Sequence, residues 1–362
     1  MIFFQMRALY LNPGDELINV VLLDQLARRD TVVALTSGVP DWYMENVIRE
    51  LGELASRVVF EPSAAGFFSK LAANAVKGRE TWLYLSPGET TQPPELDGRD
   101  RLKSAILSGL QVLPDVHIGF VGQSTTRVSP SRERVLRKAR KRGDVIAVRD
   151  ADSCTYLQSR GISATRVPDL AFALDRVRGR RAKTVGLSFR SHGPGSDRLL
   201  KDRLHALLPQ LRDAGMTAEV FWQADYDREF CEDLARDLDL PLAERRMDRS
   251  DRLTELRSLF SRMGFLLSNR LHVLLIGASR GSIPIALLSK EDEKIGPLFR
   301  DDGLDAACIR LDDPAMIERT IAVVRGAAEF DEQFARVFER NRRAICDHFD
   351  AMHGMPDPES RS

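Results

Sequence analysis

The sequence has 362 residues, of which 43% are hydrophobic and 29% are charged, and its 53 basic and 53 acidic residues give a formal net charge of zero. This length favours two domains, and the composition is typical of a globular protein. The balanced charge gives no general basic field for a nucleic-acid partner. The four cysteines are widely spaced, without a CxxC pair, and predict reduced thiols and no metal site.

The N-terminal segment MIFFQMRALYL is apolar, but it lacks the basic region and the cleavage site of a signal peptide. We therefore interpret it as part of the fold, with a first strand over residues 7–11. No segment reaches the roughly 20 apolar residues that a membrane-spanning helix needs. These features favour the cytoplasm as the compartment.

Strand-like and helix-like segments alternate along almost the whole chain, which is typical of α/β layers with parallel sheets. The expected strands are residues 7–11, 31–35, 57–60, 81–85, 117–121, 145–148, 184–189, 218–222, 265–268 and 283–289. The expected helices are residues 17–28, 40–51, 66–76, 99–110, 130–142, 151–160, 196–214, 227–237, 251–261, 273–278, 291–299 and 314–350.

The polar, Arg-rich segment 175–183 interrupts this alternation, and we interpret it as a linker. The expected parts are an N-terminal α/β domain over residues 1–178, a second α/β domain over 179–312, a long C-terminal helix over 313–350 and a flexible tail over 351–362. Two Rossmann-like domains with parallel sheets and a long C-terminal helix form a GT-B-like layout. This layout alone does not define a reaction.

The segment 263–290 brings an arginine and a histidine to the end of a buried strand. Arg270 and His272 lie between the strand 265–268 and an apolar helix, where open α/β sheets bind ligands and free backbone N–H groups attract anions. An arginine suits a carboxylate or phosphate, and a histidine suits proton transfer. The alternative is an arginine paired with a surface acid and a histidine that caps a helix.

A second arginine, Arg190, ends the first strand of the expected second domain and precedes a Gly-Pro-Gly loop that enters a helix. Two arginines and two helix N-termini at one sheet edge favour a small polyanionic ligand. Alternatively, Arg190 binds a neighbouring carboxylate. His192 is a second candidate acid or base, but we expect its glycine-rich loop to be flexible, so it ranks after His272.

Loops at strand ends in the first domain supply the candidate acceptor-binding residues Asp15, Glu16, Glu89 and Gln123. Asp15 and Glu16 either cap a helix or bind sugar hydroxyls through a carboxylate. Glu89 and Gln123 follow neighbouring strands, so we expect them at the same sheet edge. The sequence contains no GxGxxG, P-loop, HExxH or GxSxG motif, which argues against dinucleotide oxidoreductases, P-loop ATPases, zinc proteases and α/β-hydrolases.

Motifs along the chain resemble those of polysaccharide pyruvyl transferases in order and spacing, from about residue 9 to residue 305. They are the segments 12–16 (NPGDE), 148–153 (VRDADS), 168–172 (PDLAF), 186–190 (GLSFR), 267–272 (LSNRLH) and 283–286 (IPIA). Two loops depart from the family pattern. Residues 86–89 (SPGE) replace a glycine-rich loop, and residues 124–126 (STT) replace a GigP tail.

The resemblance implies a GT-B-like fold and transfer of pyruvate from phosphoenolpyruvate (PEP) to two hydroxyls of a sugar in a polysaccharide or lipid-linked glycan precursor, which forms a ketal. It implies catalytic roles for Arg270 and His272 and donor binding by Arg190, Asn269 and Leu271. It requires no metal or organic cofactor, and a lipid-linked acceptor would bring the protein to a membrane surface. The alternatives are a GT-B glycosyltransferase that uses a nucleotide sugar and a non-catalytic sugar-binding relative.

Overall fold

The computed structural model describes residues 1–89, 98–113, 115–141, 144–177, 182–243, 251–290, 292 and 295–354. The chain divides into two compact units. The first consists of Met1–Tyr10, Asp15–Leu170 and Arg343–Ser362, and the second of Leu11–Gly14 and Ala171–Arg342. These ranges differ from the expected ones, because the chain changes units after Leu170, and the short segment Leu11–Gly14 belongs to the second unit.

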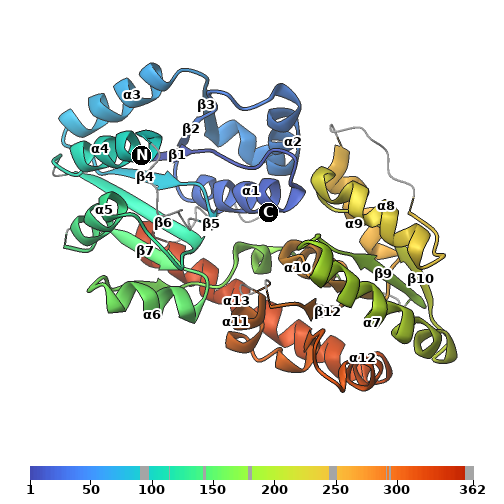
Figure 1. The fold of residues 1–362 in the computed structure, drawn as a ribbon. Coiled ribbons are helices and arrows are strands. Elements are labelled where there is room, and N and C mark those ends of the chain that lie inside the picture. The colour runs from blue at the N-terminus through green and yellow to red at the C-terminus, as the bar shows by residue number, and fades with distance from the viewer. Residues whose placement is uncertain are drawn as a thin grey trace. The chain divides into compact units, whose positions relative to one another are not determined.

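The first unit is built on a parallel sheet (Figure 1). Within the described residues the strand order is β3-β2-β1-β4-β6-β7-β8, and β5 pairs with β6. The strands are β1 Ile2–Gln5, β2 Val32–Leu35, β3 Val58–Glu61, β4 Thr81–Leu85, β5 Gly88–Glu89, β6 Val116–Ser124, β7 Val145–Val148 and β8 Thr165–Arg166. The helices that follow these strands are α1 Pro13–Ala27, α2 Asp41–Leu51, the 3-10 helix η1 Gly52–Arg57, α3 Ala64–Val76, α4 Gly98–Leu110, α5 Pro130–Lys141, α6 Ala151–Ser159 and the 3-10 helix η2 Leu170–Ala173.

The strands β2, β4 and β7 of this sheet are buried along their whole length, as expected for a parallel sheet that helices cover on both faces. Phe3 of β1 and Phe67 of α3 form an edge-to-face pair with ring centroids 5.4 Å apart. They belong to a continuous core that also contains Phe120 of β6 and Leu136 of α5. The apolar strand runs in the sequence predict this core, because each strand needs apolar side chains on both faces.

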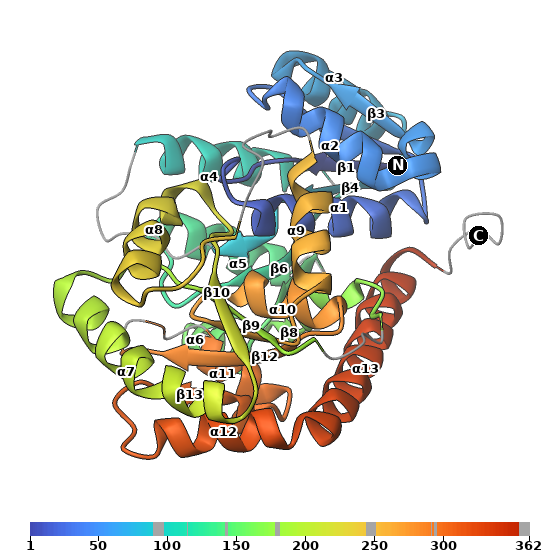
Figure 2. The same ribbon diagram turned by 90° about the vertical axis from the view of Figure 1, so that its right-hand side faces the viewer.

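The second unit is built on a smaller parallel sheet with the order β10-β9-β11-β12-β13 (Figure 2). Its strands are β9 Thr184–Ser188, β10 Thr217–Val220, β11 Phe265–Ser268, β12 Ile283–Leu288 and β13 Cys308–Arg310. Its helices are α7 Pro194–Asp213, η3 Asp225–Asp227, α8 Arg228–Asp237, α9 Arg252–Ser261, α10 Leu271–Ser279, α11 Ile295–Asp301, η5 Asp305–Ala307, α12 Met316–Arg325 and the first part of α13 Ala327–His353. Two parallel-sheet units of this kind confirm the predicted fold class.

Three predicted elements are wrong. The first strand is Ile2–Gln5 and not residues 7–11, because Ile2, Phe3 and Phe4 supply the buried side chains, whereas Leu9 is 64% exposed. The predicted helix 314–350 is two helices, α12 and α13, which are separated at Gly326. A side chain there would bring Cβ to 3.2 Å from the Ala322 carbonyl oxygen. The tail was expected from residue 351, but α13 extends to His353.

Parts of four predicted segments lie outside the described residues. These are residue 142 of the helix 130–142, residues 178–181 of the expected linker, residues 291, 293 and 294 of the helix 291–299, and the tail beyond residue 354. Helix α13 itself supplies residues to both units. In the second unit, Phe338 of α13 contacts Phe172 with ring centroids 4.9 Å apart. In the first unit, His353 of α13 forms a hydrogen bond of 2.6 Å with the Tyr84 hydroxyl.

Candidate active site

The carboxyl ends of β9 and β11 bring two arginines together in the second unit. These strands are parallel neighbours, and Ser188 pairs with Ser268. Continuing this register by two residues places Arg190 beside Arg270. The Asn269 side chain joins the two loops, because its Oδ1 accepts from Arg190 N at 2.7 Å and its Nδ2 donates to Arg190 O at 3.0 Å. Two predicted donor-binding residues, Arg190 and Asn269, therefore lie at one sheet edge with the predicted catalytic residue Arg270.

Arg270 stands at the N-cap position of α10, and two residues of η3 hold its guanidinium group. It forms an ion pair with Asp227, donates to the Tyr226 hydroxyl at 3.3 Å, and lies 4.8 Å from the centroid of that ring. Asp227 is only 2% exposed. The predicted alternative of an acid-paired arginine therefore applies to Arg270, although its partner is a buried acid.

Burial raises the pKa of the Asp227 carboxyl, and the positive charges of Arg270 and Arg190 oppose this rise. One buried carboxylate thus lies near two guanidinium groups. Arg190 has an exposed side chain, and it forms no ion pair with an acidic residue in the described part of the chain. Arg190 therefore offers a guanidinium group that an anionic ligand could bind.

His272, in the first turn of α10, lies against a short segment from the beginning of the chain. A side chain on Gly14 would place its Cβ 2.6 Å from the His272 Cβ, so only glycine fits this approach. The Gly14 N–H donates to Asn12 Oδ1 at 3.0 Å, and the Leu11 carbonyl accepts from Asp225 N at 3.3 Å. The close approach to His272 therefore explains why the NPGDE motif has a glycine at this position.

Both the side chain and the backbone of His192 have acidic partners in the structure. Its Nε2 lies 2.6 Å from Asp292 Oδ1, and its backbone N–H donates to Asp197 Oδ1 at 2.9 Å. Asp292 in turn accepts from the backbone N–H and the hydroxyl of Ser289, just after β12, at 2.8 and 2.9 Å. Because β9 and β12 flank β11, this pair belongs to the same sheet edge as Arg270.

The predicted acceptor residues have different environments in the first unit. The Asp15 carboxylate accepts from Leu9 N at 3.3 Å, so it binds backbone near the start of α1. Glu16 is fully buried, and Gln123 is 5% exposed and donates to the Ser86 carbonyl at 3.2 Å. Burial gives no support to a direct sugar contact by either residue. The side chain of Glu89 lies outside the described residues.

The VRDADS motif forms a buried network at the end of β7. Arg149 pairs with Asp169 at 2.8 Å and donates from Nε to Ser124 Oγ at 2.6 Å. The Ser124 hydroxyl donates to Asp150 Oδ2 at 2.5 Å, and Asp150 caps α6 by accepting from Ser153 N at 2.7 Å. Ser124 begins one of the two loops that depart from the family pattern, and it supplies the hydroxyl that joins Arg149 to Asp150.

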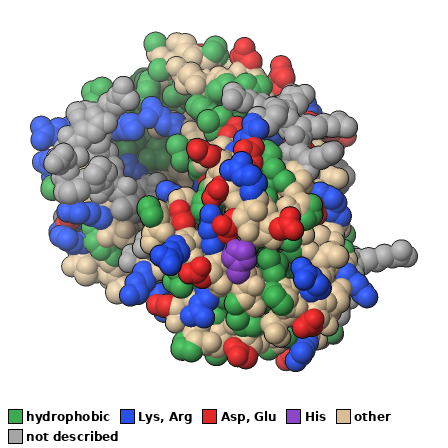
Figure 3. Space-filling view, turned by 45° about the vertical axis from the view of Figure 1, so that its right-hand side comes forward, with side chains coloured by type: hydrophobic (Ala, Val, Ile, Leu, Met, Phe, Trp, Pro, Cys, Tyr) green, Lys and Arg blue, Asp and Glu red, His purple; other side chains and the backbone are tan. Residues whose placement is uncertain are grey.

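The described residues contain neither a metal site nor a membrane-spanning helix. No group of three or more His, Cys, Asp or Glu side chains is arranged there to hold a metal ion. In the same part of the chain, no helix combines the length and the apolar character that crossing a membrane requires. On the face drawn in Figure 3, basic and acidic side chains are interspersed with apolar ones, in keeping with the balanced composition.

The two parallel-sheet units place the protein in the GT-B fold class. Similar solved structures include Staphylococcus aureus MnaA with UDP, with a TM-score of 0.52 and 10% identity over 97% of this chain and 96% of that chain. An O-GlcNAc transferase variant of Thermobaculum terrenum gives a TM-score of 0.54 and 14% identity over 97% of this chain and 65% of that chain. At these identities the likeness concerns the fold alone.

Sequence comparison then identifies the family. Residues 12–281 match the sequence model for polysaccharide pyruvyl transferase. The chain therefore belongs to the polysaccharide pyruvyl transferase family, as its ordered motifs predicted. A comparison with curated protein sequences found no match.

Proposed function

We propose that the protein transfers pyruvate from PEP to two hydroxyls of a sugar, with formation of a ketal and release of phosphate. The observation that carries this proposal is the link made by the Asn269 side chain, which binds the backbone of Arg190 and so joins its loop to the loop that contains Arg270. PEP carries a carboxylate and a phosphate, and guanidinium groups bind both through paired hydrogen bonds. Membership of the transferase family and the GT-B-like fold support the same assignment.

The two arginines would share the donor anion in different ways. Asp227 and Tyr226 already hold the Arg270 side chain in place. Binding a ligand therefore costs this side chain little further conformational entropy. Its Nε is buried and forms no hydrogen bond with described residues, and a ligand oxygen would satisfy this donor. Arg190 is exposed and would complete the contact from the neighbouring strand end. Leu271 and Asn269 would contribute through the backbone and the loop link.

The reaction requires two proton movements. Two sugar oxygens bond to C2 of PEP, one proton adds to C3 to form the methyl group, and the bond from C2 to the phosphate oxygen breaks. Of the two hydroxyl protons lost, one balances the proton gained at C3 and the other leaves with the phosphate. His272 would perform one of these transfers. His192, held by Asp292, is a second group of the required kind at the same edge.

The proposal is tested by measuring phosphate release from PEP in the presence of a panel of glycan acceptors. We expect Arg190→Gln and His272→Gln to remain folded and to lose about 100-fold or more in rate, because each removes a charge or proton donor from the transition state. His205→Gln, which changes an exposed histidine on α7, is the matched control and should keep full activity.

Full activity in both Arg190→Gln and His272→Gln would contradict the proposal. A rise in melting temperature with a nucleotide sugar, and none with PEP, would instead support a glycosyltransferase. PEP binding without turnover over the whole acceptor panel would support a non-catalytic sugar-binding relative, with the SPGE loop at residues 86–89 as the first place to look for the cause.

A further inference from the structure

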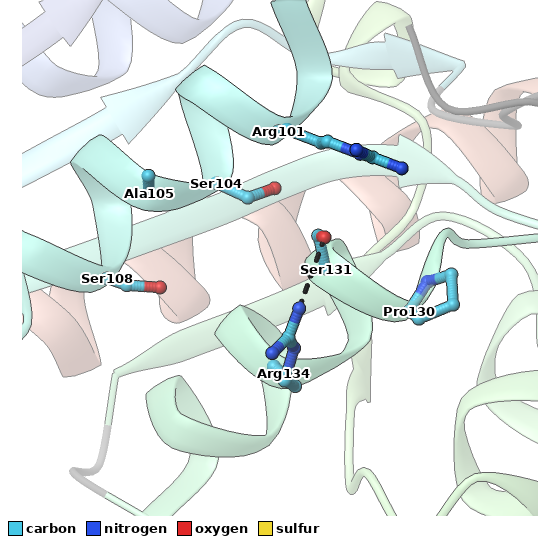
Figure 4. Close-up of a pocket in the computed structure, with 7 residues that line it drawn as sticks. All are labelled: Arg101, Ser104, Ala105, Ser108, Pro130, Ser131 and Arg134. Atoms are coloured by element: carbon cyan, nitrogen blue, oxygen red, sulfur yellow. Dashed lines mark hydrogen bonds between the residues drawn. The ribbon is translucent and has the colours of Figure 1, made fainter. Parts of the chain in front are cut away.

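A pocket of about 550 Å³ lies between α4 and α5 in the first unit (Figure 4). None of its residues takes part in the proposed pyruvyl transfer. Unlike most small-molecule pockets, which are largely apolar and aromatic, it contains no aromatic side chain among the described residues. It is lined by Arg101, Ser104, Ala105, Ser108, Pro130, Ser131 and Arg134.

Two guanidinium groups in this pocket are available to a ligand. Arg101 comes from α4 and Arg134 from α5, and Figure 4 shows them on either side of Ser131, whose hydroxyl accepts one hydrogen bond from Arg134 at 3.4 Å. Both side chains are exposed, and neither forms an ion pair with an acidic residue in the described ranges. Glu133 of α5 is already engaged, because it accepts from Arg137 at 2.7 Å. The positive charge in the pocket is therefore not neutralised by the neighbouring acid.

Ser104 provides an independent sign of a ligand. Its side chain is 4% exposed, lines the pocket, and has a buried hydroxyl that forms no hydrogen bond with described residues. Buried hydroxyls in folded proteins nearly always have a partner, because losing water without replacing it is unfavourable. Figure 4 shows this hydroxyl on the side of α4 that faces α5. A ligand oxygen in the pocket would supply the missing partner.

The pocket also contains the beginning of α5, a helix of 12 residues. Ser129 precedes the helix and accepts from Arg132 N at 3.1 Å, and Pro130 and Ser131 in the first turn line the pocket. A helix N-terminus carries a partial positive charge and attracts anions. The guanidinium group of Arg132 stacks on Phe120 at 4.6 Å from the ring centroid, and Arg132 does not line the pocket.

We infer that the α4–α5 pocket binds a phosphate or diphosphate group of an anionic ligand. Two guanidinium groups, three serine hydroxyls and a helix N-terminus offer more donors than one carboxylate accepts, and phosphate oxygens match this number. A volume of about 550 Å³ leaves space for a diphosphate and the group that it carries. A lipid headgroup and a soluble phosphate ester present the same chemistry. Leu102 and Ile106 of α4 are 63% and 39% exposed, and such apolar side chains could contact a lipid. The test therefore includes lipid vesicles.

The test measures binding of inorganic pyrophosphate by calorimetry, in an Arg190→Gln background that weakens the proposed donor site. We expect Arg101→Gln/Arg134→Gln to lower the affinity about tenfold or more, because two charge-assisted contacts are lost. The matched control Arg236→Gln/Arg336→Gln removes the same charge from arginines that are 75% and 70% exposed, and should bind as the parent does.

Ser104→Ala separates binding from folding. Removing a buried hydroxyl without a protein partner should leave the protein at least as stable, so a severalfold loss of pyrophosphate affinity in this variant reports the ligand contact. In a second arm, vesicles of phosphatidylglycerol and of phosphatidylcholine are sedimented with each protein. Retention on phosphatidylglycerol that the pocket substitutions abolish would assign the phosphate to a lipid, and pyrophosphate binding without retention would assign it to a soluble ligand.

Equal pyrophosphate and vesicle binding by Arg101→Gln/Arg134→Gln and by the matched control would overturn the inference. The result is independent of the proposed pyruvyl transfer. Phosphate release from PEP is measured separately in proteins without the Arg190→Gln change, so that a loss of one property is not mistaken for a loss of the other.

Discussion

The carboxyl edges of the two sheets carry family motifs of similar composition but different environment. At the first edge, Arg149 is buried and binds Asp169 and the Ser124 hydroxyl, which in turn donates to Asp150. At the second edge, Arg190 is exposed, and the one buried carboxylate near it is paired with Arg270. An arginine in a family motif therefore has a structural role at one edge and a proposed binding role at the other. The exposure of the arginine side chain distinguishes the two roles, whereas the sequence motifs do not.

The largest effect on stability is expected from Arg149→Ala. Because it leaves Asp169 buried without its ionic partner, the free energy of unfolding should fall by about 3–5 kcal/mol in urea denaturation. Arg190→Ala, at the other edge, should change it by no more than about 0.5 kcal/mol, because the side chain is exposed.

The double variant Arg149→Met/Asp169→Leu tests the cause of that loss. If the unpaired charge is responsible, replacing both partners by apolar side chains of similar size should restore much of the stability. A double variant as unstable as Arg149→Ala would assign the loss to the serine and helix-cap contacts instead. Equal losses in Arg149→Ala and Arg190→Ala would remove the distinction between the two edges.

Acid should weaken the first unit through the histidines of α13. Burial lowers the pKa of His348 and His353 to about 4, from an ordinary value of 6.5. Unfolding exposes both rings, so the unfolded chain binds more protons between these pH values, and stability falls as the pH drops from about 6.5 to about 4. Each histidine should account for about 2 kcal/mol of this loss at pH 5.

Thermal unfolding of His348→Gln at pH 7 and pH 5 measures this contribution. The variant should lose less stability on acidification than the parent protein does. His205→Gln, which changes a histidine that is 52% exposed in the second unit, should keep the parental pH dependence. A parental pH dependence in His348→Gln as well would contradict the assignment.

A smaller loss than that of Arg149→Ala is expected from adding a methyl group at Gly14. Its Cβ would collide with the His272 side chain, so Gly14→Ala should destabilise the protein by about 1 kcal/mol and displace the imidazole, which lowers phosphate release from PEP. Gly109→Ala is the control, because a Cβ there meets nothing within 4 Å and α4 should gain about 0.5–1 kcal/mol. Full activity and stability in Gly14→Ala would show that His272 is free to move.

Much of the fold follows from periodicity in the sequence. The strands at residues 81–85, 145–148 and 265–268 were predicted with their observed bounds, because each is a short apolar run between polar turns. Prediction failed where a local preference competes with packing. Residues 7–11 look like a strand, but the pairing with β2 and β4 uses Ile2–Gln5. At Gly326 a helix ends inside a segment whose apolar pattern continues.

The candidate site was predicted at its arginines but not at the acids that hold its side chains. Asp227 comes from a loop 43 residues before Arg270, and Asp292 lies 100 residues after His192. Only the strand order brings these loops to one edge, and no local pattern encodes it. The sequence did contain a signal for these acids, because each comes shortly after a strand of the same sheet. Asp227 follows β10, and Asp292 follows β12. Acids at such positions are candidates to orient an arginine or histidine at a neighbouring strand end.

The way α13 is shared has a consequence for synthesis on the ribosome. Leu11–Gly14 emerge early but belong to the second unit, whereas Arg343 and the residues after it emerge after the second unit and complete the first unit. The first unit therefore lacks the partners of Tyr84 and Arg29 until α13 is made. The first unit therefore cannot complete its folding before the second unit is synthesised, as an N-terminal domain does in vectorial folding. Its two halves reach their final packing only after translation of α13.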